Sequence, residues 1–485
     1  MAELAAVPAA MRGLRGLVRT GTALAAVLAI GGCGASRGDA SAPGQIPQLS
    51  WQMPAGNVNP APFMARLQTI VSSAPGPVTI IQLGDSHTAG DKFSGRLREL
   101  FQNRYGGAGR GEMGAGSPFG FFEPSLVAVV QTDGWRIENS RSGAAIGPFS
   151  ISGYTVIGDS PTDSMVLQST EPAGFEVIEI GAFEHPGGGS LEILVDGRQV
   201  GVMRTNANRN RLVRFSQQVL RGSRQLVLRP IGDGEVWLSS WDTYRNTRGV
   251  VLESHGIVGA TVGISNRWDR DAYLSELTAA DPAMVILAYG TNEGFNDDLE
   301  PEEYRAEFSA QLSQIEAAAP NASIVIVGPP DAARLPANCR SDDVESITFP
   351  CGPLSQSDRA NYRALFGDNA QGAACRWHQP PNLDMVRAIQ AQVANQRGYY
   401  FWDWSRAMGG ACSVHEWAQR EPPLARRDHI HLTDEGYRLS ADALFRDLTG
   451  SGAVASVPRG DQPGRGLDDT GLRDALDGMM ELSPP

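Results

Sequence analysis

The sequence is poor in basic residues. Of its 485 residues, 54 are Asp or Glu and 41 are Lys or Arg, which gives a formal net charge of −13. Lys92 is the only lysine, so nearly all of the positive charge comes from arginine. A surface with this excess of negative charge repels a phosphate backbone. The composition therefore argues against a nucleic-acid partner.

The apolar N-terminal segment Thr22–Ile30 is too short to span a membrane comfortably. Three arginines precede it and Ile30-Gly-Gly-Cys33 follows it, which resembles the lipobox of bacterial lipoproteins. We therefore expect residues 1–33 to be a lipoprotein-type signal peptide, with Cys33 as the lipidated residue and 34–50 as a tether. An ordinary signal peptide, in which Cys33 is incidental, is the alternative. Both predict export to the cell envelope, in the periplasm, and a lipid at Cys33 adds a membrane anchor.

Cysteine is scarce and does not show the spacing of a zinc site. Apart from Cys33 the chain has four cysteines and no Cys-x-x-Cys pair, so zinc binding is the weaker alternative. An even number of cysteines in an exported chain indicates disulfides. The favoured pairs are Cys339–Cys351 and Cys375–Cys412, although three connectivities are possible.

A phosphate-binding loop is also absent from the sequence. The glycine-rich run Gly106–Gly116 follows a predicted helix instead of opening one, and no Gly-Lys-Ser/Thr comes after it. We expect this run to form a flexible or tightly folded loop.

Strand and helix patterns alternate in residues 51–124 and 246–450. Five short apolar segments of strand length are expected at 78–83, 249–254, 284–289, 323–327 and 399–404. Helical patterns lie between them. Such alternation predicts a parallel sheet covered by helices on both faces. We assign both parts to one α/β catalytic domain and residues 451–485 to a mobile tail.

Residues 125–245 show a different pattern. Apolar and polar residues alternate over short segments that turns such as Val195-Asp-Gly-Arg198 separate. This predicts an inserted all-β module, a sandwich or jelly roll, which either binds glycan or only shapes a cleft. The module contains Trp135, Trp237 and Trp241, whose rings could stack on sugars. We prefer the alternative that these side chains pack in the core of the module.

The segment Val78–Asp91 carries the most informative motif. The run Val78–Leu83 predicts a strand, Gly84-Asp-Ser86 predicts a sharp turn, and a helical pattern follows. A serine on such a turn is well placed to be a nucleophile, because a helix N-terminus favours developing negative charge. The alternative is that Ser86 only caps the helix.

Asp428 and His431 are the candidate partners of Ser86. His431 is the candidate base, and Asp428, three residues earlier, is able to orient its imidazole. Polar motifs follow several of the predicted parallel strands, whose C-terminal ends meet at one edge of the sheet. We therefore expect the catalytic group to assemble at that edge.

The candidate oxyanion donors are the backbone N–H groups of Ser86 and Gly259 and the side-chain amide of Asn292. Glycine at 259 allows close approach of the backbone to a substrate. His87 and His255 are candidate cleft-lining residues.

These residues resemble the four conserved blocks of the SGNH (GDSL-like) hydrolase family. The blocks are Gly84-Asp-Ser86, Gly259, Gly290-Thr-Asn-Glu293 and Asp428-x-x-His431, in the family's order. Each block alone is a weak signal, whereas all four in order are specific. The resemblance implies a three-layer α/β/α fold and a serine esterase or acyltransferase that needs no metal or other cofactor.

The long insertion between the serine and glycine blocks departs from the family's usual spacing. The insertion, the segment Gly84–Asp91 and the turn Arg104-Tyr-Gly-Gly107 together resemble the corresponding features of the peptidoglycan O-acetylesterases. Those enzymes remove acetyl groups from O-6 of muramic acid. The resemblance implies an O-acetylated glycan as the substrate, with peptidoglycan preferred. The alternatives are a polysaccharide O-acetyltransferase with the same triad and a non-catalytic envelope-binding lipoprotein.

Overall fold

The computed structural model describes only the central part of the chain. The predicted signal peptide with Cys33, the tether and the C-terminal tail lie outside it. No helix of the described part is long and apolar enough to cross a membrane. The described residues are 57–145, 147–336, 339, 349–366 and 375–450.

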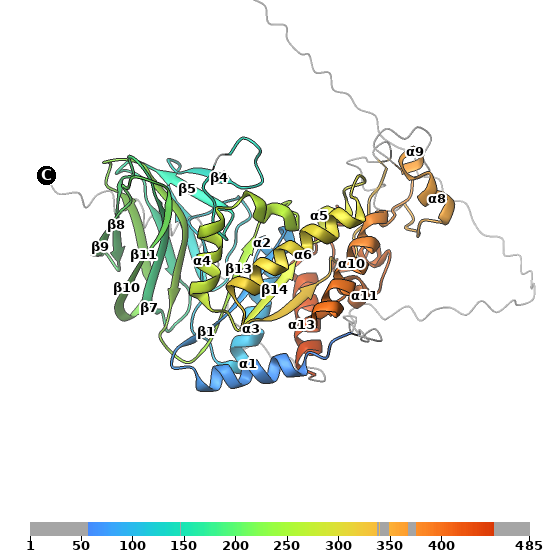
Figure 1. The fold of residues 1–485 in the computed structure, drawn as a ribbon, viewed down its shortest axis with the longest axis horizontal. Coiled ribbons are helices and arrows are strands. Elements are labelled where there is room, and N and C mark those ends of the chain that lie inside the picture. Colours follow the sequence, from blue (N-terminus) through green and yellow to red (C-terminus); the bar gives the residue numbers. More distant parts are fainter. Residues whose placement is uncertain (1–56, 146, 337–338, 340–348, 367–374, 451–485) are drawn as a thin grey trace, which may run out of the picture. The chain divides into compact units, whose positions relative to one another are not determined.

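In the described residues, a five-stranded parallel sheet forms the centre of the α/β part (Figure 1). Gly84 of the first strand is in register with Gly256 and Ala288 of its two neighbours, so the turns that follow these strands start at one edge. The predicted parallel sheet is confirmed. In spatial order the strands are β13 (Gly249–Gly256), β1 (Pro77–Gly84), β14 (Met284–Ala288), β15 (Ser323–Val327) and β16 (Tyr400–Trp402).

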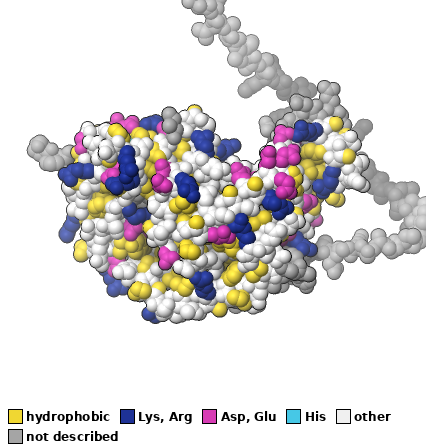
Figure 2. All heavy atoms as spheres, in the orientation of Figure 1, with side chains coloured by type: hydrophobic (Ala, Val, Ile, Leu, Met, Phe, Trp, Pro, Cys, Tyr) yellow, Lys and Arg dark blue, Asp and Glu magenta, His cyan; other side chains and the backbone are white. Residues whose placement is uncertain are grey.

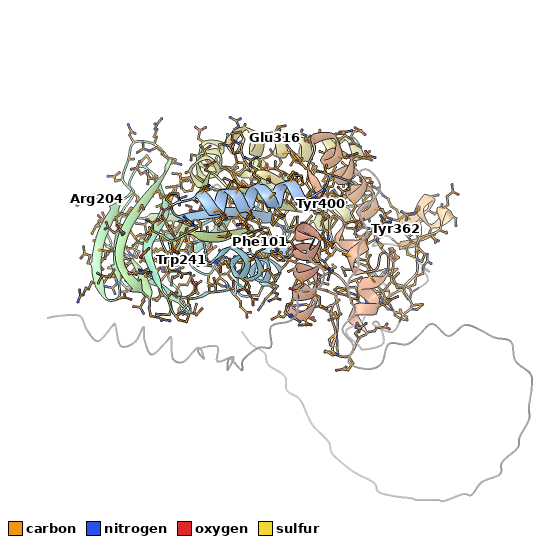
Figure 3. The ribbon with its side chains drawn as sticks, turned by 90° about the horizontal axis from the view of Figure 1, so that it is seen from below. Phe101, Arg204, Trp241, Glu316, Tyr362 and Tyr400 are labelled. Atoms are coloured by element: carbon orange, nitrogen blue, oxygen red, sulfur yellow. A yellow bond between two sulfur atoms is a disulfide. The ribbon has the colours of Figure 1, made fainter. Side chains whose placement is uncertain are left out.

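Helices cover both faces of this sheet because its strands bury apolar side chains on both. Ile80 and Met284 belong to one apolar cluster, and the residues that follow them, Ile81 and Val285, belong to another. Phe101 lies in the first cluster, beneath the blue helix of Figure 3. The three-layer α/β/α fold is confirmed. The first cluster includes α1 (Ala61–Ser73), α3 (Lys92–Tyr105) and α13 (Asp434–Thr449), and the second α4 (Arg270–Ala280), α6 (Pro301–Ala318) and α10 (Pro381–Arg397).

The strands between β1 and β13 form two antiparallel sheets in the described residues. One has the order β10-β7-β12-β5-β4, with β2 paired to β12, and the other has the order β3-β6-β11-β8-β9. The predicted inserted β module is confirmed. Its strands are β2 (Met113–Gly114), β3 (Val127–Gln131), β4 (Arg136–Asn139), β5 (Tyr154–Gly158), β6 (Met165–Ser169), β7 (Phe175–Glu184), β8 (Ser190–Val195), β9 (Arg198–Arg204), β10 (Arg211–Ser223), β11 (Gln225–Pro230) and β12 (Val236–Tyr244).

The two sheets of the module share one apolar core. Ile180 of β7 and Leu226 of β11 belong to the same cluster of buried side chains. Trp135 and Trp241 lie in this core, and Figure 3 shows Trp241 among the strands. Trp237 is half-buried and stacks on a histidine. Core packing therefore explains Trp135 and Trp241, two of the three tryptophans considered for stacking on sugar rings.

Short helices follow several strands of the parallel sheet. Two of them, α2 and α5, come directly after β1 and β14, at the edge where the polar motifs lie. The short helices are α2 (Ser86–Ala89), η1 (Val262–Arg267), α5 (Thr291–Gly294), α8 (Gln356–Ala360), α9 (Tyr362–Phe366), α11 (Trp404–Met408) and α12 (Ser413–Ala418).

The disulfides join pairs other than the predicted ones. The bonds are Cys339–Cys375 and Cys351–Cys412, so the favoured Cys339–Cys351 and Cys375–Cys412 are wrong. The reason is a long-range pairing of the backbone. The segment that follows Cys375 runs beside both Arg334 and Cys351 through isolated β-bridges. This brings Cys375 next to Cys339 and leaves Cys351 for Cys412.

Several charged side chains are buried where the module meets the parallel sheet, whereas charges of both signs are interspersed on the face shown in Figure 2. Burial, with a smaller contribution from the carboxylate of Glu112, raises the pKa of Glu276 to about 8. The backbone N–H of Ile151 donates to Glu276 Oε2 at 2.9 Å. A cavity of about 280 Å³ there is lined by Arg214 and by the carboxylates of Glu112, Glu179, Asp242, Glu253 and Glu276.

We expect Glu276→Gln to stabilise the protein above about pH 8 and to change its stability little near pH 4.5. The pKa of Glu276 is higher in the folded than in the unfolded state. The wild type therefore loses stability as the pH rises between the two values, and glutamine does not titrate. The gain in unfolding free energy at about pH 8.5 is on the order of 3–5 kcal/mol.

Denaturant unfolding at about pH 5 and about pH 8.5 measures this difference. The matched control is Glu302→Gln, whose side chain is 84% exposed and should show no such difference. An equal effect of Glu276→Gln at both pH values would contradict the prediction.

Candidate active site

Ser86 is the first residue of α2, directly after the turn that ends β1. The helix cap is Asp85, whose carboxylate accepts a hydrogen bond from the His87 N–H at 3.0 Å. A Cβ at Gly84 would overlap with the side chain of Thr88, so the turn requires glycine there. Since Asp85 caps the helix, the alternative that Ser86 is only a cap is wrong. The Ser86 hydroxyl remains available for other contacts.

Ser86, His431 and Asp428 form a continuous chain of hydrogen bonds. Ser86 Oγ lies 3.0 Å from His431 Nε2, and His431 Nδ1 lies 2.7 Å from Asp428 Oδ2. The side chains of His431 and Asp428 are 35% and 43% exposed, so a substrate is able to reach them from solvent. The structure thus brings the three predicted catalytic residues into contact.

The environment of Asp428 keeps this carboxylate ionised. Burial alone would raise its pKa, but hydrogen bonds from His431 and from the backbone of Ile430 and His431 lower it to about 2. An ionised Asp428 accepts a hydrogen bond from the Nδ1–H of His431, and this leaves Nε2 unprotonated as the acceptor that faces Ser86. This is the tautomer that general-base catalysis requires.

Gly259 and Asn292 follow the two strands that flank β1, Gly259 on the loop after β13 and Asn292 on α5 after β14. Ile257, just after β13, donates its N–H to the Gly84 carbonyl at 3.0 Å, and Asp85 donates its N–H to the Ala288 carbonyl of β14 at 3.4 Å. Both loops are therefore tied to the turn that carries Ser86.

Two hydrogen bonds hold the Gly259 loop against α5. Asn292 Nδ2 donates to the Ala260 carbonyl at 2.8 Å, and the Val262 N–H donates to Glu293 Oε1 at 2.8 Å. Gly259 has a φ of 73°, which favours glycine. Gly259 and Asn292 thus belong to one rigid structure beside the serine turn.

Glu293 is a positioning residue that the sequence analysis did not assign. Its side chain is buried, and burial raises its pKa to about 8, so it is protonated at neutral pH. It fixes the Gly259 loop through Val262 without placing a negative charge beside Asn292. Its position directly after Asn292 in the motif Gly290-Thr-Asn-Glu293 is the one sequence feature that could have indicated this role.

The two histidines considered as cleft-lining are buried. His87 and His255 are each 3% exposed, so that prediction is corrected for both. The ring centroids of His87 and His431 are 5.4 Å apart, and His87 Nδ1 lies 2.9 Å from the Tyr437 hydroxyl. Burial and, to a smaller extent, the charge of His431 lower the pKa of His87 to about 3. His255 lies on the same face of β13 as Glu253, which lines the cavity toward the module.

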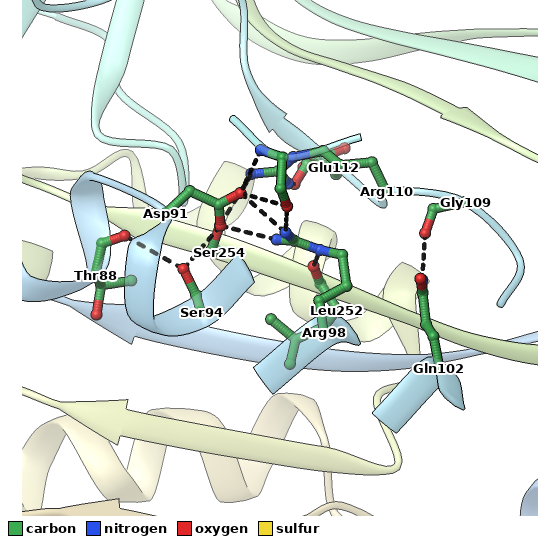
Figure 4. A network of polar contacts seen from close by, with 11 residues as sticks. Thr88, Asp91, Ser94, Arg98, Gln102, Gly109, Arg110, Glu112, Leu252 and Ser254 are labelled. Atoms are coloured by element: carbon green, nitrogen blue, oxygen red, sulfur yellow. Dashed lines mark hydrogen bonds and ion pairs between the residues drawn. The ribbon is translucent and has the colours of Figure 1, made fainter. Parts of the chain in front are cut away.

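A buried ion network holds the other end of the serine motif (Figure 4). Arg98 donates to both carboxylate oxygens of Asp91 at 2.9 and 3.0 Å, and Ser254 Oγ donates to one of them at 2.8 Å. Arg110 Nη2 lies 3.6 Å from Asp91 Oδ2. Burial alone would raise the pKa of Asp91, but the charges of Arg98 and Arg110 hold it well below its usual range. The network ties α3 and β13 to the segment that leads into the module.

A family model supports the resemblance noted in the sequence. The GDSL-like lipase/acylhydrolase family model matches residues 232–439. This range contains Gly259, Asn292, Asp428 and His431, and Ser86 lies before the inserted module. The match confirms the predicted resemblance. A comparison with curated proteins finds no match.

One of the similar solved structures shows the same fold. A peptidoglycan O-acetylesterase superposes on 81% of this chain and 97% of its own, with a TM-score of 0.62 and 24% sequence identity. A family two carbohydrate esterase from Clostridium thermocellum covers 65% of this chain and 98% of its own, with a TM-score of 0.26 and 12% identity. A salicylyl-acyltransferase from a tetracycline biosynthetic pathway covers 70% and 97%, with a TM-score of 0.30 and 10% identity. The last two superpose too loosely to support an inference.

Proposed function

We propose that this chain, a GDSL-like (SGNH) acylhydrolase, is an exported serine esterase that removes O-acetyl groups from an envelope polysaccharide, namely peptidoglycan. The observation that carries the proposal is the chain of hydrogen bonds from Ser86 through His431 to Asp428. The predicted signal peptide and the predicted lipid anchor at Cys33 support the location, and the similarity to a peptidoglycan O-acetylesterase supports the substrate.

In the first half-reaction Ser86 Oγ attacks the acetyl carbonyl carbon while His431 Nε2 takes the hydroxyl proton. The oxyanion that forms accepts hydrogen bonds from the N–H groups of Ser86 and Gly259 and from the amide of Asn292. As the carbon–oxygen bond to the sugar breaks, His431 gives its proton to the sugar oxygen. The sugar alcohol leaves, and the acetyl group stays on Ser86 as an ester.

In the second half-reaction water attacks the acetyl group on Ser86. His431 takes a proton from the water and later returns it to Ser86 Oγ, which releases acetate. Asp428 stays ionised throughout and stabilises the imidazolium form of His431 in both steps.

A panel of acetylated substrates tests this proposal. Acetate release from O-acetylated peptidoglycan is expected to exceed release from acetylated xylan at equal ester concentration. Activity on an aryl acetate without release from peptidoglycan would overturn the substrate assignment. Transfer of acetyl to added sugar acceptors, with little free acetate, would identify an O-acetyltransferase instead.

We expect Asn292→Ala to lower kcat by about 100- to 1000-fold, because it removes a donor to the oxyanion. KM should change less, since this donor acts mainly in the transition state. Steady-state kinetics on an aryl acetate measures the effect, and thermal unfolding checks that the Gly259 loop remains folded. Asn296→Ala, an exposed asparagine four residues away, is the matched control. An unchanged kcat would exclude Asn292 from the oxyanion hole.

A further inference from the structure

Phe121, in the connection between β2 and β3 of the inserted module, is an exposed aromatic side chain. Its exposed fraction is 52%, and no other aromatic side chain of the described residues is exposed. The ring has a neighbour, because its centroid lies 4.7 Å from that of Phe119. A phenyl ring left in water stabilises the folded state little, so it is available for contact with a ligand.

A tight turn fixes the backbone of Phe121. The turn comprises residues 119–122, and the Phe122 N–H closes it by donating to the Phe119 carbonyl at 3.0 Å. The rings at its two ends contact each other edge to face, with centroids 5.3 Å apart. Phe119 packs against the second apolar cluster of the α/β part, and Phe122 packs against the core of the module. Phe121 is therefore held at a defined place between two packed side chains.

One end of this turn lies against the support of the Gly259 loop. The ring centroid of Phe119 is 5.9 Å from that of Tyr154. The hydroxyl of Tyr154 contacts the backbone of Val258, the residue before Gly259. Ile257 and Tyr154 also belong to the same apolar cluster. The turn is thus next to the loop that carries a predicted oxyanion donor.

The other end of the turn is tied to the helices that follow the catalytic residues. Lys92 Nζ lies 2.6 Å from Glu123 Oε2 and 3.2 Å from Asp434 Oδ2. Lys92 is the first residue of α3, which follows the serine helix α2. Asp434 is the first residue of α13, just after His431. These contacts on both sides hold Phe121 beside the candidate active site.

We propose that Phe121 is a sugar-binding platform, on which a neutral pyranose ring of the substrate glycan stacks while the adjoining sugar presents its ester to Ser86. The inference rests on the proposed esterase function, which places a glycan chain at this site. The face of a pyranose ring exposes C–H groups with partial positive charge, and these favour the electron-rich face of a phenyl ring. Trp135 and Trp241 are buried and unable to make such a contact, whereas Phe121 is accessible.

Binding to the full chain carrying Ser86→Ala tests the platform without requiring turnover. The ligand is the tetramer of N-acetylglucosamine, which is neutral and carries no ester. We expect Phe121→Ala to weaken its binding about 5- to 30-fold and Phe121→Trp to retain it. The matched control is Leu220→Ala, which removes an exposed apolar side chain of the same module and should change nothing.

NMR of the bound tetramer reports the stacking itself. Ring protons of one sugar should shift upfield on binding to the protein with Phe121, because they lie over an aromatic ring, and this shift should be lost with Phe121→Ala. Binding that is absent in the parent protein, or equal in Phe121→Ala, would overturn the platform. An upfield shift that survives Phe121→Ala would overturn it as well.

The kinetics of Phe121→Ala in the otherwise wild-type chain give a second reading. We expect the apparent KM for O-acetylated peptidoglycan to rise about 5- to 30-fold with little change in kcat. Hydrolysis of ethyl acetate, which is too small to reach the platform, should be unchanged. An equal loss of kcat/KM on both substrates would mean that Phe121 supports the catalytic loop instead, which overturns the platform. Failure of the esterase function shows separately, as absent acetate release by the wild type.

Discussion

Ser86→Ala is expected to lower kcat for an aryl acetate by about 10⁴- to 10⁶-fold while the protein remains folded. The substitution removes the attacking oxygen. It should cost little stability, because Ser86 is only half-buried and the cap of α2 is Asp85. The rate that remains would come from the oxyanion donors alone. Steady-state kinetics and circular dichroism on the same preparation measure both quantities.

Two further variants sharpen this prediction. Ser72→Ala, an exposed serine on α1, is the control and should retain full activity. The double variant Ser86→Ala with His431→Ala should be no slower than either single variant, because the two residues act as a unit. A folded Ser86→Ala variant with kcat within about tenfold of the wild type would exclude Ser86 as the nucleophile.

Asp91→Ala is expected to lower the free energy of unfolding by about 3–5 kcal/mol. It leaves the charges of Arg98 and Arg110, whose side chains are 1% and 2% exposed, without the carboxylate that faces them. It also removes the hydrogen bond from Ser254. Urea unfolding near neutral pH measures the loss.

The pH dependence of this effect follows from the low pKa of Asp91. The contribution of its carboxylate is complete above the ordinary pKa and is lost as the pH falls toward the folded-state value. The difference between wild type and variant should therefore shrink below about pH 4. Asp442→Ala is the control, since its pairs with Arg96 and Arg438 lie at the surface and should contribute about 1 kcal/mol or less. Equal losses from the two substitutions would contradict the role of the network.

Much of the α/β fold could be predicted because its signals are local. The β-branched run Val78–Leu83 became β1, and the element ends differ from prediction by only a few residues. Two strands of the module lack the alternation from which the sequence predicts the module. Tyr154–Gly158 is buried along its whole length and Met165–Ser169 nearly so, so neither shows the alternation that marks a half-exposed strand.

The candidate site was predictable in part for the same reason. Sheet-edge geometry brings Ser86, His431 and Asp428 together, and their catalytic roles stay predictions. The pairing of Lys92 with Asp434 joins residues far apart in the sequence, and no local pattern reports it. The disulfide of Cys351 likewise depends on a pairing with the distant Trp377, so nearness in sequence was a poor guide.

Acetate release from O-acetylated peptidoglycan, compared between the wild type and Ser86→Ala, tests the central claim most directly. The account predicts steady release by the wild type and none above background by the variant, with both proteins folded. Release by both proteins would contradict the nucleophile. No release by a wild type that hydrolyses an aryl acetate would contradict the substrate.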